Sequence, residues 1–222
     1  MDARTSTLRP HWSERLLLRL SDSRTIDGLP VHASEGKGKA ALDRVEAALA
    51  LIKTFDRRRF DRVRRDIERV WVRLLPGALA RFNRDVCACE LDTRFVLDQE
   101  STAEIIAAAI VHEATHARLE RCGLEYDEEK RLRIEAICVR REHAFLAKLP
   151  NGEAARSWVD SHTHETPGWL TDTAFAERTR EGEIEVLRSL GTPEWVVRTV
   201  LTVAGARLTL GKMLRKLRAP AP

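Results

Sequence analysis

The sequence predicts an α+β fold with a helical majority and a small mixed sheet of three or four strands. Apolar residues recur at every third or fourth position over long stretches, and only short stretches between 70 and 98 look extended. A chain of 222 residues can bury one core without disulfides. We expect a single domain over 1–222, with a core at 56–150, a helical N-terminal extension at 1–55 and C-terminal helices at 151–222.

Composition and charge exclude several classes of protein. Charged residues make up 32% and hydrophobic residues 43% of the chain, which is typical of a folded protein rather than a disordered one. The net charge is +4, but acidic residues are interspersed among the basic ones, so we expect no nucleic-acid partner. Neither a signal peptide nor a membrane span is evident, and four cysteines are too few for a disulfide framework. A cytoplasmic location is therefore expected.

The N-terminal third predicts two helices after an irregular start. Residues 1–36 show no regular pattern beyond a short strand or helical turn at 16–20 and a turn at 27–28. A helix is expected over 39–55, where four apolar residues share one face: Leu42, Val45, Leu49 and Ile52. The Arg-rich segment 56–68 has helical spacing as well, with its guanidinium groups expected to face water.

The sequence then predicts three short strands, at 70–75, 86–91 and 93–98. Pro76-Gly77 ends the first of them. Alternation along the second would place Cys87 and Cys89 on the same side of the sheet, as two small buried residues.

The strongest helical signal covers about 102–121. Ser101 and Glu104 form a capping box at its start, and Gly123 is a natural stop at its end. A second helix is expected over about 127–149, ended by Pro150. Further helices are predicted at 153–164, 172–190 and 194–217.

The first of these helices contains a His-Glu-x-x-His motif. His112 and His116 lie one turn apart on the same face, so both imidazoles can reach one metal ion. Glu113 lies about 100° around the helix from His112. It therefore flanks the metal without binding it, which is where a general base must stand.

A zinc hydrolase needs a third protein ligand and an open fourth position. One known continuation of the motif ends in Gly-x-x-His, but here Leu119 and Cys122 occupy those positions. A downstream histidine (His143, His162 or His164) or a carboxylate on a later helix remains. Glu135 is the best candidate, because eighteen intervening residues let a second helix return antiparallel to the first. Glu142, seven residues further along the same face, is the reserve.

His112-Glu113-Ala114-Thr115-His116 followed by Glu135 resembles the gluzincin zinc metallopeptidases, and the short spacing resembles their compact members, the minigluzincins. The resemblance covers about 70–149. It implies a zincin-like domain with Zn²⁺ held by His112, His116 and Glu135. It also implies a small sheet beside the motif helix, whose edge strand binds an extended peptide; by position, 93–98 would be that strand.

The resemblance also implies a reaction. Zinc would lower the pKa of its bound water toward about 7, Glu113 would take the proton, and a peptide bond of a peptide or protein substrate would be hydrolysed. Tyr126, the only tyrosine, is the candidate oxyanion stabiliser, with His162 and His164 as alternatives. Many gluzincins place an acid four residues after the glutamate ligand. Val139 occupies that position here, so support for the metal histidines must come from elsewhere.

Two alternatives to a peptidase stay open. One is a non-catalytic zincin-like protein with a binding or regulatory role. The other is an adaptor that its arginine content would direct to a membrane surface or a nucleic acid. The membrane version would use the apolar segment 194–217, which carries scattered arginines and lysines. It is predicted to be either a core or dimer helix with a cationic last turn or an interfacial helix on a membrane surface.

Overall fold

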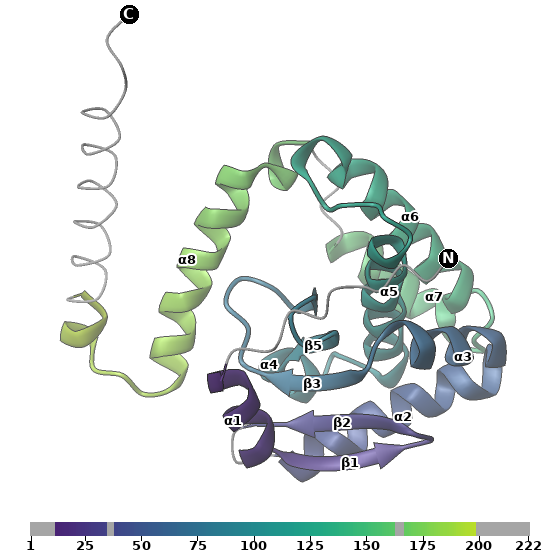
Figure 1. Cartoon of the computed structure of the whole chain (residues 1–222), viewed down its shortest axis with the longest axis horizontal. Coiled ribbons are helices and arrows are strands. Elements are labelled where there is room, and N and C mark those ends of the chain that lie inside the picture. The colour runs from purple at the N-terminus through teal and green to yellow at the C-terminus, as the bar shows by residue number, and fades with distance from the viewer. Residues whose placement is uncertain (1–11, 35–37, 163–166, 199–222) are drawn as a thin grey trace, which may run out of the picture.

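The computed structural model describes residues 12–34, 38–162 and 167–198 (Figure 1). Within these ranges the chain forms one sheet of five strands, in the order β1-β2-β3-β5-β4. The β2-β3 and β3-β5 pairs are parallel and the two outer pairs are antiparallel. The strands are β1 (Asp22–Ile26), β2 (Leu29–Ala33), β3 (Arg69–Arg73), β4 (Ala80–Asn83) and β5 (Ala88–Asp92).

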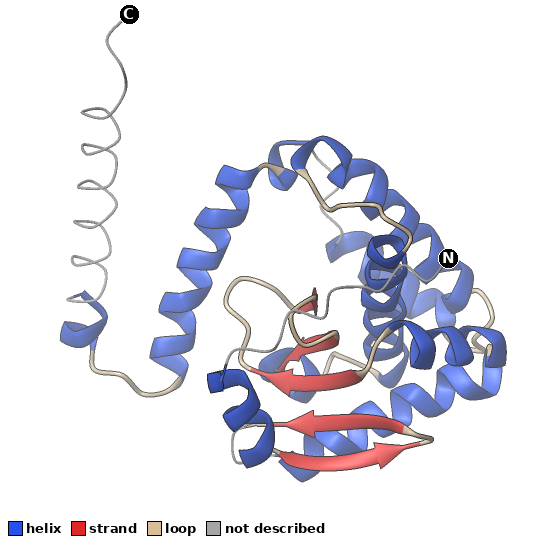
Figure 2. Ribbon diagram, in the orientation of Figure 1, coloured by secondary structure: helices blue, strands red, loops and turns tan. Residues whose placement is uncertain are grey.

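Helices make up most of the described chain (Figure 2). The predicted α+β fold with a helical majority and a small mixed sheet is thereby confirmed, although the sheet has five strands rather than three or four. The helices are α1 (Trp12–Leu20), α2 (Gly38–Phe55), α3 (Arg57–Asp66), α4 (Thr93–Leu97), α5 (Ala103–Arg121), α6 (Glu128–Leu146), α7 (Gly152–His162) and α8 (Asp172–Ser189), with a 3₁₀ turn, η1 (Pro167–Leu170).

The main core lies where the sheet meets α2, α3 and α5. Helix α2 packs against β1, β2 and α5, while α5 also contacts α3 and β4. Fully buried aliphatic side chains fill this space, among them Val45 and Leu49 of α2, Val72 of β3, and Ile106 and Ile110 of α5. Because residues of α5 pack here along much of its length, the helix that carries the two histidines is fixed against the sheet.

Residues 93–97 form the helix α4, so the prediction that 93–98 is the edge strand is wrong. Asp92 explains the difference, because its carboxylate caps the backbone amides of Arg94 and Phe95 and starts α4 there. The edge beside α5 is formed instead by β4, which pairs with β5 and which the sequence did not reveal.

The N-terminal segment 1–55 was expected to be a helical extension, but part of it forms strands. Residues 22–33 form a hairpin whose second strand pairs with β3, so this segment belongs to the sheet. Asp27 and Gly28 both have positive φ, 49° and 83°, which is typical of a tight two-residue hairpin turn. Cys87 likewise has a positive φ, 46°, and precedes β5, so the expected strand alternation of Cys87 with Cys89 is wrong.

Helix α8 packs against the loop between β3 and β4, although the two segments are far apart in the sequence (Figure 1). The contact requires glycine, because a Cβ at Gly182 would lie 1.9 Å from the backbone N of Gly77. Most of the predicted helix at 194–217 lies outside the described residues. Within the described part, no helix combines the length and the apolar character needed to cross a membrane.

Candidate metal centre

Helices α5 and α6 bring His112, His116 and Glu135 together. The Nε2 atom of His112 lies 3.1 Å from Glu135 Oε2, and Nε2 of His116 lies 3.4 Å from Glu135 Oε1. The three side chains are mostly buried, with exposed fractions between 15% and 18%. The carboxylate is thus in contact with both imidazoles.

Local sequence explains why the two helices meet at these residues. The hydroxyl of Thr102 accepts a hydrogen bond from the backbone amide of Ile105 and caps the start of α5. The capping residue is therefore one position later than the predicted Ser101. Gly123 ends the turn after α5 with a φ of 83°. Asp127 then caps α6 through the amide of Lys130. The short connection makes α6 return along α5, which brings Glu135 back to the histidines.

Glu142 lies on the other side of the His112 ring. Its Oε2 is 3.1 Å from Nδ1 of His112, while Glu135 faces Nε2. A carboxylate at Nδ1 fixes the tautomer and the orientation of a metal-binding imidazole. The reserve ligand candidate is therefore placed to orient His112, and it supplies the support that Val139, which has no polar group, does not give.

Glu113 is buried, with an exposed fraction of 7%. Burial raises the pKa of its carboxyl group, although the charges of His116 and His112 oppose the rise. A carboxylate with a raised pKa is a stronger base, which suits proton abstraction.

Tyr126 reaches the same cluster from the loop between α5 and α6. Its hydroxyl donates a hydrogen bond to Glu135 Oε1, and its ring meets the His116 ring edge-on, with centroids 5.2 Å apart. The guanidinium of Arg131 covers the Tyr126 ring at 5.4 Å and that of Phe175 in α8 at 4.9 Å. Helix α8 thus helps to hold Tyr126 beside the histidine cluster.

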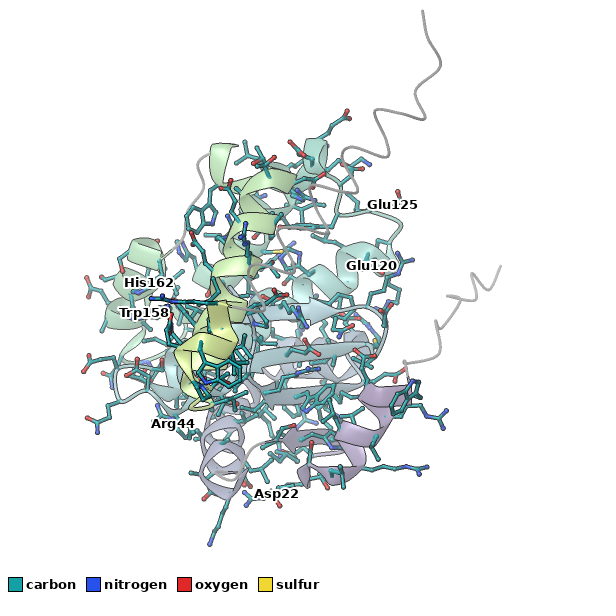
Figure 3. The ribbon with its side chains drawn as sticks, turned by 90° about the vertical axis from the view of Figure 1, so that its left-hand side faces the viewer. Asp22, Arg44, Glu120, Glu125, Trp158 and His162 are labelled. Carbon is teal, nitrogen blue, oxygen red and sulfur yellow. The ribbon has the colours of Figure 1, made fainter. Side chains whose placement is uncertain are left out.

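The other candidate histidines make contacts outside this cluster. His162 stacks on Trp158 in its own helix, with ring centroids 3.9 Å apart (Figure 3). His143 lies 3.0 Å from Asp160. His164 lies outside the described residues.

The cluster contains more negative than positive groups. Burial lowers the pKa of His112, but its contacts with Glu135 and Glu142 outweigh burial and raise it well above its usual value. Burial also opposes ionisation of Glu135, yet both imidazoles hold its pKa well below the usual range. Three carboxylates (Glu113, Glu135 and Glu142) thus surround two imidazoles, and a bound cation would balance them.

Sequence reasoning missed one member of the cluster. Cys138 of α6 is fully buried, and it offers a sulfur within 4.8 Å of one ring nitrogen of each of His112 and His116. Its spacing of three residues from Glu135 could have placed it on the same helix face.

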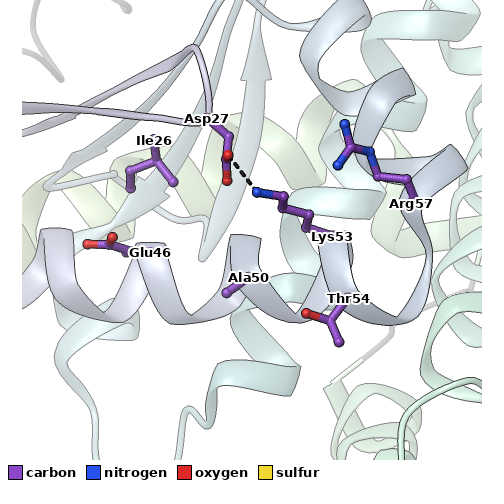
Figure 4. Close-up of a pocket in the computed structure, with 7 residues that line it drawn as sticks. All are labelled: Ile26, Asp27, Glu46, Ala50, Lys53, Thr54 and Arg57. Carbon is purple, nitrogen blue, oxygen red and sulfur yellow. Dashed lines mark hydrogen bonds and ion pairs between the residues drawn. The ribbon is translucent and has the colours of Figure 1, made fainter.

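An open pocket lies elsewhere, between the β1-β2 turn and the end of α2 (Figure 4). Its charged side chains are paired with each other or their neighbours; Lys53, for example, donates to Asp27 at 2.6 Å. None of the residues that line this pocket belongs to the histidine cluster between α5 and α6.

Comparisons of the chain with protein-family models, curated proteins and solved structures found no match. The functional argument therefore rests on the motif and on the geometry of this cluster.

If the cluster holds a divalent metal ion, replacing Glu142 by Gln is expected to weaken its binding by about 10- to 100-fold, because the charge that orients His112 through Nδ1 is lost. The dissociation constant can be measured by competition with a chromogenic chelator. Glu129 is exposed on the same helix, so Glu129→Gln makes the same chemical change as a control. Equal affinities in the two variants would rule out this role for Glu142.

Proposed function

We propose that this protein is a zinc-dependent hydrolase that cleaves peptide bonds. The observation that supports the proposal best is the contact of one carboxylate with both imidazoles of the His-Glu-x-x-His motif, across two different helices. A buried glutamate beside them supplies a base.

The donor set suits zinc. Two histidines and a carboxylate are a known ligand set of catalytic zinc, with bonds of about 2.0–2.2 Å. Neighbouring ligands in a tetrahedral site of this size are roughly 3.3 Å apart. The distances of 3.1 and 3.4 Å from Glu135 to the two imidazoles are close to that separation.

Bound zinc would supply Lewis acidity toward water and toward the substrate carbonyl. His112, His116 and Glu135 would hold the metal, and Glu142 would keep His112 in position. Glu113 would take a proton from the attacking water and pass it to the leaving amine. The hydroxyl of Tyr126 could leave Glu135 and donate to the oxygen on which negative charge develops.

Strand β4 is the part of the structure best placed to hold a peptide. It lies at the end of the sheet, pairs with β5 and contacts α5, the helix that carries both histidines. An extended substrate could add to its outer edge through backbone hydrogen bonds, with little demand on the substrate's sequence. We therefore assign β4 the substrate-binding role that the sequence had suggested for 93–98.

The test is a measurement of zinc content and of peptide cleavage on freshly purified protein. We expect about one zinc per chain and cleavage of an unstructured protein such as casein. Chelation should abolish the cleavage, and added zinc should restore it. Purified protein that neither contains nor takes up zinc would disprove the proposal, as would cleavage that survives removal of the metal.

A further inference from the structure

Cys138 is a buried thiol beside the candidate metal ligands that the proposed reaction does not use. It lies on α6 between Glu135 and Glu142, three and four residues from them, so the three side chains form one stripe facing α5. The stripe meets both histidines, because the sulfur is within 4.8 Å of a ring nitrogen of each.

The Cys138 thiol lies beside the two histidines of the motif rather than in a purely apolar core. Its side chain is fully buried, and burial raises its pKa. Three carboxylates raise that pKa further, those of Glu135, Glu113 and Glu142. A divalent cation at the histidines would reverse the local field, since a coordinating thiol loses its proton outright.

We propose that Cys138 is a fourth protein ligand of the resting metal centre, beside His112, His116 and Glu135. The inference rests on the metal centre of the proposed function and adds a soft ligand to it. Thiolate favours zinc and cadmium over hard cations such as magnesium and manganese. The sulfur–hydrogen bond breaks as the sulfur–metal bond forms, and the proton passes to solvent.

This ligand set has a consequence for activity. Four protein ligands are typical of closed, structural zinc sites, whereas catalytic sites keep one position open. Cys138 would therefore have to leave this position, taking back a proton from solvent, before water could occupy it. Cys138 would thus close the resting centre to water.

Cobalt spectroscopy of the full chain tests the proposal directly. Co²⁺ replaces zinc in such sites, and a thiolate ligand adds a sulfur-to-cobalt charge-transfer band in the near ultraviolet. We expect this band in the wild-type protein. It should disappear in Cys138→Ser and Cys138→Ala, while the visible bands of bound cobalt remain. Cys122 is exposed at the end of α5, so Cys122→Ser is the matched control and should keep the band.

Three results would overturn the inference. A wild-type protein that binds cobalt without the near-ultraviolet band has no sulfur ligand, although the proposed metal centre would remain supported. A band that persists in both Cys138 variants arises from another cysteine. A wild-type protein that binds no cobalt would remove the proposed function together with the inference.

Discussion

Replacing Glu113 by Gln is expected to lower peptide cleavage by about 10²- to 10⁴-fold, the usual contribution of a general acid–base group. Zinc content should stay at the wild-type level, because the proposed ligands are His112, His116 and Glu135, and Glu113 is proposed as the base rather than as a ligand. Glutamine has nearly the same shape but takes up no proton at neutral pH. Cleavage rates at saturating peptide and zinc content of the same preparation measure both quantities.

Glu120 provides the control for this substitution. It lies on the same helix, seven residues from Glu113, and pairs with Arg84 at the surface at 2.6 Å. Exposed ion pairs contribute little stability, so Glu120→Gln should leave cleavage unchanged. If Glu113→Gln retains both zinc and full cleavage, Glu113 is not the base. If the wild type binds zinc but cleaves nothing, the non-catalytic binding protein becomes the better interpretation.

The sequence alone predicted the part of the candidate site that depends only on helix periodicity. His112 and His116 are one turn apart, and that separation holds wherever the helix lies. The contact of Glu135 with them followed from the length of chain needed to turn at Gly123 and return. The role of Glu142 did not follow. Which nitrogen of His112 it faces depends on how α5 and α6 cross, and spacing does not encode that crossing.

The errors in the fold arose where tertiary contacts outweigh local pattern. Segment 93–98 contains β-branched and aromatic residues, yet Asp92 binds the amides that begin a helix and also accepts the amide of Leu75 at 2.7 Å. Strand β4 has only four residues, so the alternation of apolar and polar side chains along it is too short to identify a strand from the sequence. The site itself was less affected, because it depends on two long helices.

Zinc is expected to stabilise this protein strongly, because it would bind the folded centre and not the unfolded chain. At a free zinc concentration 100 times the dissociation constant, the free energy of unfolding rises by about 2.7 kcal/mol. In a chain of this length, that corresponds to a rise in the melting temperature of about 5–10 °C. Thermal melts of metal-free protein, with and without added zinc, measure the rise.

The substitution His116→Ala should remove most of this stabilisation, since one of the candidate ligands is lost while the other contacts of α5 remain. Without metal, a protonated His112 can bridge Glu135 and Glu142, so the variant is expected to fold and to melt in the absence of zinc. His162→Ala removes an imidazole that stacks on Trp158 outside the centre, and it should keep the full zinc-dependent rise. Equal rises in both variants would mean that zinc stabilises the chain from another place, and the pairing of α5 with α6 around one cation would be refuted.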